Sequence, residues 1–132
     1  MIIEGDVKNQ FRSGALRDRL NDASLAASRV ELYIRCPNLT ALEWRNEEIW
    51  AGDCRCMSLL RVDLSGCPRL KRLGECLFLE CSALEEVVFP KNLQIIGEEA
   101  FSKCSALRSI TLPENLKIIE EMAFNECVGL PL

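Results

Sequence analysis

The sequence of 132 residues contains no histidine, and this absence removes several kinds of functional site. Histidine is the usual acid/base group near neutral pH, the base of the common nucleophilic sites and a frequent metal ligand. A cysteine nucleophile in this chain would lack that base. A Gly-rich phosphate-binding loop is also missing from the sequence. We therefore expect a protein that is not an enzyme and that needs no cofactor.

An excess of positive charge is also lacking. The chain has 16 Lys and Arg against 20 Asp and Glu, which gives a formal net charge of -4. Nucleic-acid binding needs a concentrated basic surface, so it is not expected. The acid pairs Glu85-Glu86, Glu98-Glu99 and Glu120-Glu121 are interpreted as solvated, because adjacent side chains point apart.

Long apolar runs do not occur either. No stretch approaches the ~18 apolar residues of a membrane span, and Glu4, Asp6 and Lys8 interrupt the start where an export signal needs apolar residues. We expect a protein of the cytoplasm or another reducing compartment. Aromatic residues make up only 6% of the chain against 48% hydrophobic residues, which favours one domain with a largely aliphatic core.

What the sequence does contain is a repeat. Residues 75–97, ECLFLECSALEEVVFPKNLQIIG, align with residues 98–120, EEAFSKCSALRSITLPENLKIIE, with nearly half of the positions identical. A third copy begins at Glu121 and stops halfway. A fixed period of this length is typical of solenoids. Three columns recur: Phe78, Phe101 and Phe124; Cys81, Cys104 and Cys127; Leu84, Leu107 and Leu130.

Each copy predicts one strand, a turn and a return segment. The alternation around Ile110 and Leu112 suits a short strand with one buried face, and such strands at a fixed period form a parallel sheet. Pro90 and Pro113 suit the turn that follows. The segment from Glu98 to Phe101 predicts a short helix or helical turn, with Phe101 buried between coils.

Two looser copies precede these. Residues 59–74 form a degenerate copy, and Arg29-Val30-Glu31-Leu32 echoes Arg61-Val62-Asp63-Leu64, which sets the preferred register of the first copy. A rival register places Leu39, Leu42 and Trp44 on the strand columns. It ranks second, because it leaves the similarity between residues 29–32 and 61–64 unexplained. Just beyond each strand, Cys67, Asn92 and Asn115 are predicted to form a structural hydrogen-bonding ladder inside the turn.

These copies resemble the leucine-rich repeat, whose pattern matches Leu59, Val62, Leu64 and Cys67. Residues 100–119 look like the BspA-like subclass, and the copy at Leu59 resembles the cysteine-containing repeats found beside F-boxes. The resemblance implies an α/β leucine-rich-repeat solenoid, with a short parallel sheet on one face and helical turns on the other. It also implies binding of partner proteins through the sheet face, and most members of such families are not enzymes.

The remaining segments complete the predicted domain organisation. Leu16, Leu20, Ala23 and Ala27 recur at helical spacing, so residues 1–28 are predicted to form an N-terminal capping helix. Residues 29–132 then hold about four repeats, the last one incomplete, and residues 43–55 are an expected insertion. Eight cysteines suggest zinc or disulfides, but paired C-x-x-C spacing and an export signal are both missing. We predict no metal site and free thiols.

Two surfaces are candidates for binding a protein partner. The first is the sheet face, predicted as two rows of outward side chains with Tyr33 beside them: Arg29, Arg61, Glu86 and Ser109, and Glu31, Asp63, Val88 and Thr111. These residues could also be ordinary solvated positions that pair along the sheet. The second is the C-terminal end around Phe124 and Leu130, where an apolar face predicts self-association or a partner.

The sequence therefore predicts a non-enzymatic interaction or scaffold module, with a role as a subunit of a larger assembly left open. Two alternatives stay open. One is a surface or adhesin-type fragment, a role that BspA-like relatives often have. The other is the substrate-recognition part of a ubiquitin-ligase adaptor, which the Cys67-Pro68 turn favours.

Overall fold

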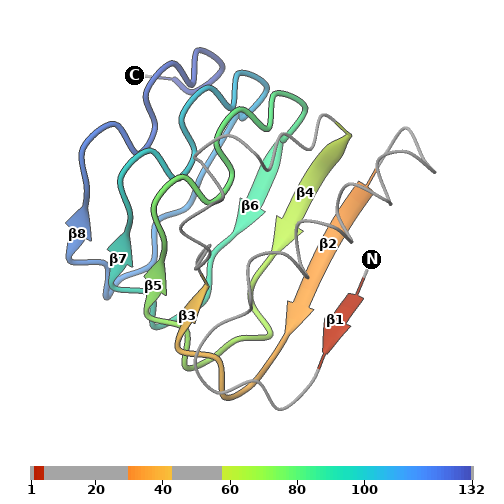
Figure 1. Ribbon diagram of the computed structural model, residues 1–132, viewed down its shortest axis with the longest axis vertical. Helices are drawn as coiled ribbons and strands as arrows, with labels where there is room; N and C mark the ends of the chain where they lie inside the picture. The colour runs from red at the N-terminus through yellow and green to blue at the C-terminus, as the bar shows by residue number, and fades with distance from the viewer. Residues whose placement is uncertain (1, 5–29, 43–57, 132) are drawn as a thin grey trace, which may run out of the picture.

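The computed structural model describes residues 2–4, 30–42 and 58–131. Strands in this part of the chain form two four-stranded sheets in which every pairing is parallel (Figure 1). The first sheet has the order β1-β2-β4-β6, with the strands Ile2–Glu4, Val30–Arg35, Leu59–Asp63 and Glu86–Val88. The second has the order β3-β5-β7-β8, with the strands Ala41–Leu42, Arg72–Leu73, Ile95–Ile96 and Ile118–Ile119.

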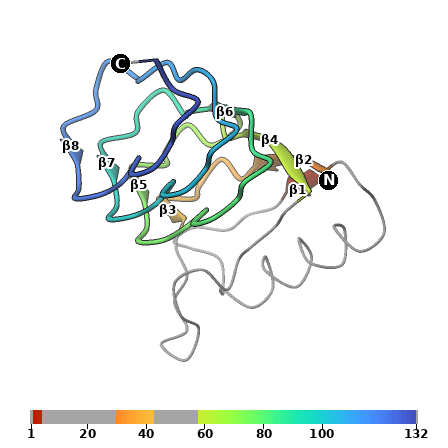
Figure 2. The ribbon, with the colours of Figure 1, turned by 90° about the horizontal axis from the view of Figure 1, so that it is seen from above.

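Successive coils of the chain lie one on the next, as the view in Figure 2 shows. Val62 pairs with Val87 in the first sheet, and Glu86 pairs with Ser109 through a single parallel bridge. The predicted parallel sheet of a solenoid is therefore confirmed. Stacked coils of this kind bury one continuous apolar interior, because each coil alone cannot cover its own apolar side.

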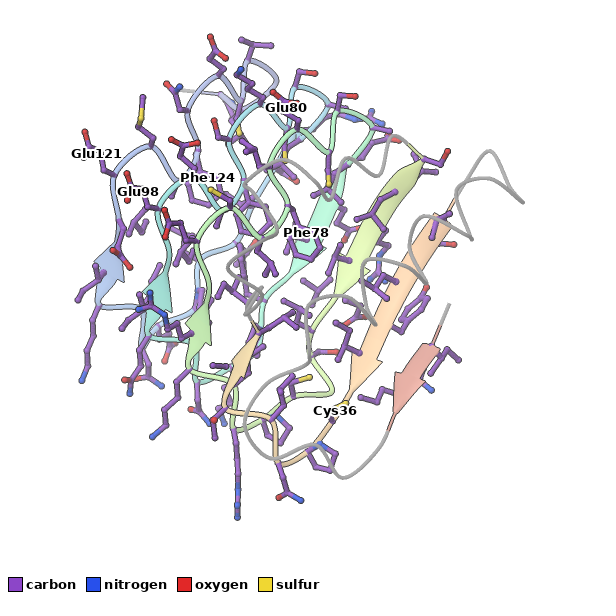
Figure 3. The ribbon with its side chains drawn as sticks, in the orientation of Figure 1. Cys36, Phe78, Glu80, Glu98, Glu121 and Phe124 are labelled. Carbon is purple, nitrogen blue, oxygen red and sulfur yellow. The ribbon has the colours of Figure 1, made fainter. Side chains whose placement is uncertain are left out.

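The core lies between the two sheets and is mainly aliphatic, as the composition predicts, with a row of phenylalanines along it. Phe101 is fully buried and occupies the middle of this row. Its ring lies 5.6 Å from that of Phe78, 5.8 Å from that of Phe89 and 5.4 Å from that of Phe124. The two ends of the row, Phe78 and Phe124, are labelled in Figure 3.

The predicted helical turns are not found, because the described residues contain no helix. The segment around Glu98–Phe101 is a series of tight turns in which the Ala100 N–H donates to Gly97 O at 3.1 Å. Glu99 and Lys103 have φ angles of 55° and 62°, in the left-handed region. A left-handed residue interrupts a right-handed helix, so the backbone bonds to the next coil instead, as in the 2.8 Å bond from Phe101 N–H to Ala123 O.

The N-terminal region also differs from the prediction where it is described. Ile2–Glu4, part of the predicted capping helix, form the strand β1 and pair in parallel with β2. The rest of that predicted helix lies outside the described residues, as do the predicted insertion at 43–55 and Arg29.

The register of the first copy also differs from the prediction. Leu32 pairs with Val62 and Tyr33 with Asp63, so β2 is displaced by two residues from the preferred register, with an irregularity between Val30 and Glu31. The rival register is wrong as well, because Leu39 is buried in the turn and Leu42 belongs to β3. The displacement brings Ile34, which is fully buried, into the core.

The last predicted strand is shorter than predicted. Only Ser109 bridges to β6, and residues 110–112 are not part of a strand. Leu112 is 43% exposed, whereas Phe89, at the same place in the preceding coil, is 9% exposed. Leu112 therefore stands outside the core row that Phe89 joins.

Candidate functional site

The outward side chains of the first sheet form the main candidate site. We call this surface the sheet face, and its members in β2, β4, β6 and the following coil are Glu31, Tyr33, Arg61, Asp63, Glu86, Val88, Ser109 and Thr111. Strand residues alternate between the core and this face, which in β2 gives buried Val30, Leu32 and Ile34 between exposed or half-buried neighbours. The corrected register produces the rows Glu31–Arg61–Glu86–Ser109 and Tyr33–Asp63–Val88.

Tyr33 lies between two cations on this face. Its ring centroid is 5.8 Å from the Arg35 guanidinium carbon and 5.5 Å from that of Arg61. Contacts at this distance are attractive because a cation is drawn to the ring quadrupole. The Tyr33 hydroxyl donates to Glu31 Oε1 at 3.3 Å. The prediction included Tyr33 but missed Arg35. Arg35 follows the buried Ile34, and its place on the sheet face can be inferred only when the register of β2 is known.

Arg61 joins the three strands of the sheet face. Its Nε donates to Glu86 Oε2 at 3.0 Å and its Nη1 to Asp63 Oδ2 at 3.3 Å. Partial burial lowers the pKa of Arg61, but its hydrogen bond to Glu86 and the charges of Glu86 and Asp63 outweigh this and raise the pKa above its ordinary value. The guanidinium is therefore held in one place by neighbours on both sides.

Asp63 is fixed from a second direction. Its Oδ1 accepts hydrogen bonds from the Ser65 amide at 2.9 Å and the Ser65 hydroxyl at 2.6 Å. Burial favours the protonated acid, yet these bonds and the Arg61 charge lower the pKa of Asp63 below its ordinary value of 3.8. At neutral pH the sheet face therefore presents a charged, hydrogen-bonded network whose side chains are already ordered.

A groove opens on the sheet face beside this network. It has a volume of about 480 Å³ and lies between the end of β6 and the following coil, with Val88, Phe89, Thr111 and Pro113 in its lining. Glu86 contributes to both the groove and the charged network. Three predicted sheet-face residues, Glu86, Val88 and Thr111, are thus brought to one concave site, while Ser109 lies on the face outside the groove lining.

The predicted turn ladder consists of two separate arrangements. Asn115 donates to Asn92 Oδ1 at 3.4 Å, and Asn92 donates to Pro68 O at 3.0 Å. Cys67 is fully buried, and its thiol donates instead to Ile34 O at 3.2 Å. The asparagines therefore contact each other, whereas Cys67 contacts the preceding coil inside the core.

The C-terminal surface is built differently from its prediction. Phe124 is stacked on Phe101 with a 4° angle between the rings, and both Phe124 and Leu130 are partly buried against the core. The exposed apolar side chains of the last described coils are Leu112, Ile118, Ile119, Met122 and Val128. The role of this surface in self-association stays a prediction.

The thiols on the turn side repeat one contact. The Cys104 thiol donates to Phe78 O at 3.2 Å, and the Cys127 thiol donates to Phe101 O at 3.0 Å. Burial raises the pKa values of Cys67, Cys104 and Cys127 above the ordinary thiol value, and raises that of Cys76 to about 11 with the help of nearby glutamates. The six cysteines of the described residues are buried, and they are thiols rather than members of disulfides.

A column of carboxylates lies beside these turns. Burial and the charges of Glu75 and Glu121, with smaller effects of Glu99 and Glu120, raise the pKa of Glu98 above its ordinary value of 4.5. Glu98 and Glu121 are labelled in Figure 3. Glu86 and Glu121 of the predicted acid pairs are exposed, whereas Glu98 is half-buried and interacts with acids of the neighbouring coils.

Two further searches cover the part of the chain that the structure describes. Within residues 2–4, 30–42 and 58–131, the acidic and cysteine side chains form no group that could hold a metal ion. In the same ranges, no helix has the length and apolar character needed to cross a membrane. Cys54 and Cys56, considered for zinc, lie outside the described residues.

The chain resembles known repeat proteins. Residues 54–131 match the family model described as "BspA type Leucine rich repeat region (6 copies)". A comparison with curated proteins finds no match.

Two solved structures resemble this one. The leucine rich repeat protein of T. pallidum has a TM-score of 0.63 and 25% identity, over 97% of this chain and 50% of the other. A leucine-rich repeat protein from Eubacterium ventriosum ATCC 27560 has a TM-score of 0.49 and 22% identity, over 94% of this chain and 31% of the other. The chain thus spans half the length of the first of these proteins and about a third of the second.

Proposed function

The chain belongs to the family of BspA-type leucine-rich repeat proteins, and we propose that it is a non-enzymatic module that binds a partner protein through the sheet face. The match of residues 54–131 to the family model supports the class of activity. The observation that carries the choice of surface is the network centred on Arg61, which joins β2, β4 and β6.

Such a network suits protein recognition for physical reasons. Tyr and Arg are the side chains most often found at binding hot spots, because each combines a large contact area with directed hydrogen bonds. Binding costs less free energy when the side chains are already ordered. Here Arg61 is held by Glu86 and Asp63, so a partner meets a surface whose groups are in place before contact.

The electrostatics of the network centred on Arg61 support binding rather than acid/base catalysis. Two of its titratable groups have shifted pKa values: the pKa of the Asp63 carboxylate is lowered and that of the Arg61 guanidinium is raised. Both stay charged at neutral pH, whereas an acid/base catalyst needs a pKa near the working pH. The role of the module within a larger scaffold or assembly belongs to the same proposal.

The proposal is tested by removing the two charges of one ion pair at a time. The variant Arg61→Gln with Glu86→Gln keeps the net charge and removes the central pair of the sheet face, whose Nε–Oε2 distance is 3.0 Å. The control Arg72→Gln with Glu120→Gln removes a pair of 3.6 Å that involves β5 of the other sheet. Each pair is partly exposed and worth only ~0–1 kcal/mol of stability, so both variants are expected to fold.

Proteins retained from a lysate of the source cells by the wild-type chain are then quantified for each variant. We expect a specific partner to be retained by the wild type and the β5 control and to lose at least about tenfold in affinity for the sheet-face variant. Equal retention by both variants would exclude the sheet face as the binding surface. Conversion of a small substrate by the purified chain would argue against a non-enzymatic role.

A further inference from the structure

The groove on the sheet face marks the place where coil pairing stops. On one side of β6, pairing continues to its end through Asp63↔Val88. On the other side, the bridge Glu86↔Ser109 is the last pairing to β6 within residues 58–131. The groove of about 480 Å³ lies between Val88–Phe89 and the segment 111–115.

The lining of the groove combines apolar and polar side chains. Val88, Phe89 and Pro113 supply apolar surface, and Thr111 stands at the side. Pockets of roughly 300–1,000 Å³ with apolar walls are typical of binding sites, so the groove has room for one or two large side chains. Lys91 contributes one positive charge to the lining, whereas Glu86 and Glu114 contribute two negative charges, which disfavours an anionic ligand.

A backbone donor at the groove supports a specific mode of binding. Where the coils of β4 and β6 stay paired, the Leu64 N–H, just beyond the end of β4, donates to Val88 O at 2.9 Å. The corresponding donor one coil further is the Phe89 N–H, and it finds no acceptor within the described residues. Phe89 is only 9% exposed and lines the groove, so a partner for its N–H can come only from the groove side. A bound carbonyl oxygen would satisfy it.

We propose that this groove binds an extended segment of the partner protein, with a backbone carbonyl accepting from Phe89 N–H and an apolar side chain packed between Val88 and Pro113. Extended peptides add to sheets in this way: backbone bonds supply affinity, and pockets for alternate side chains supply specificity. The inference rests on the proposed function, because the groove shares Glu86, Val88 and Thr111 with the sheet face.

An extended segment fits the groove better than the other occupants. A phosphate or other compact anion would meet Glu86 and Glu114 as well as Lys91. A flat protein surface would leave the Phe89 donor without an acceptor, because a folded surface cannot reach into a groove of this kind. A peptide supplies both a carbonyl and an apolar side chain from the same few residues.

The test uses the full chain and a phage library of random linear 12-residue peptides as the probe. Selected peptides are synthesised, and their affinities are measured by calorimetry. Thr111→Trp fills the groove from an exposed position, whereas the control Ser105→Trp adds the same side chain at an exposed position of the same coil away from the groove lining. Amide exchange of Phe89 is followed with and without peptide.

The expected result is a set of peptides with a central apolar residue that bind the wild type and Ser105→Trp alike. Thr111→Trp should weaken them by at least about tenfold, and binding should slow exchange of the Phe89 amide. Peptides that bind Thr111→Trp as well as the wild type, or a library that yields no binder, would overturn the groove proposal.

The same variants separate this inference from the proposed function. If the natural partner is lost with Arg61→Gln/Glu86→Gln but is unaffected by Thr111→Trp, the sheet face binds and the groove does not. If sedimentation instead reveals a dimer of the chain that Thr111→Trp dissociates, the occupant is a second copy and the peptide proposal is wrong.

Discussion

Replacing Phe101 with alanine tests the stacked core most severely. Phe101 is fully buried, and its ring contacts those of Phe78, Phe89 and Phe124 at centroid distances of 5.4 to 5.8 Å. A buried Phe→Ala change costs ~3–5 kcal/mol from lost burial and the cavity that remains. Because Phe101 lies in the middle of the row, coils on both sides lose contact, which places it toward the upper end of that range.

Urea unfolding followed by circular dichroism measures this loss. With ~4 kcal/mol lost and a slope of ~2 kcal/mol/M for a domain of this size, the midpoint should fall by ~2 M. Stabilities of small domains are ~5–15 kcal/mol, so the variant should be near the limit of folding. If it does not fold, Phe101→Leu keeps most of the volume and should show the same effect in reduced form.

Phe124→Ala is the matched control. Phe124 is only partly buried and stacks on Phe101 from one side. Its truncation should cost roughly half as much, because a partly exposed ring has less burial to lose. A loss below ~1 kcal/mol for Phe101→Ala, or equal losses at the two positions, would refute the continuous core between stacked coils.

Three further predictions concern the turns. Cys67, Cys76 and Cys104 should resist a thiol reagent at neutral pH in the folded protein and should react after denaturation. The reason is that burial raises the pKa values of their thiols, that of Cys76 to about 11. Rapid labelling of these cysteines in the folded protein, located by mass spectrometry, would contradict their burial. The raised pKa of Glu98 means that the folded protein binds the proton of the Glu98 carboxyl more tightly than the unfolded chain does, so the stability that this protonation contributes is present at low pH and is lost as the pH rises through and above 4.5. Glu98→Gln should flatten this part of the profile of melting temperature against pH, and the exposed control Glu114→Gln should not. Parallel profiles for the two variants would disprove the interaction of Glu98 with the neighbouring carboxylates. Glu126→Gly should stabilise the protein by ~0.5–1 kcal/mol in urea unfolding, because Glu126 has a left-handed φ of 59° that glycine adopts without strain. A loss of stability would contradict backbone strain at this position.

The sequence predicts the core columns well because repetition and burial coincide there. Phe78 and Phe101 recur at one spacing and are fully buried, and Val87 lies in a parallel strand beside Val62. Each column follows from a physical demand that every coil must meet, which is to cover the apolar side of its neighbour.

The register of β2 could not be derived in the same way. Val30, Leu32 and Ile34 alternate along one strand, so a shift by two residues keeps an apolar residue at every buried position. Sequence identity favoured the wrong choice, and only the pairing of Tyr33 with Asp63 settles it. The shift matters for the site, because it places the Tyr33 ring against Arg61.

The tight turns were not predicted, because the sequence carries little indication of their left-handed residues. Left-handed residues are usually glycine or asparagine, but here they include Glu99, Lys103 and Met122. The segment Glu-Glu-Ala-Phe at residues 98–101 therefore predicts the start of a helix, although the left-handed Glu99 prevents a right-handed helix from continuing there. The groove could not be predicted from the sequence either, because residues 110–112 have the apolar pattern of the strand residues 87–89 but do not pair as a strand.

Photo-crosslinking from two serines of one coil tests most directly the claim that the sheet face binds the partner. Ser109 bridges to β6 and lies on the sheet face, whereas Ser105 is exposed on the turn side four residues earlier. With benzoylphenylalanine placed at each position in turn, a crosslink to the partner from position 109 and none from position 105 is the expected result. A crosslink from position 105 alone would contradict the account.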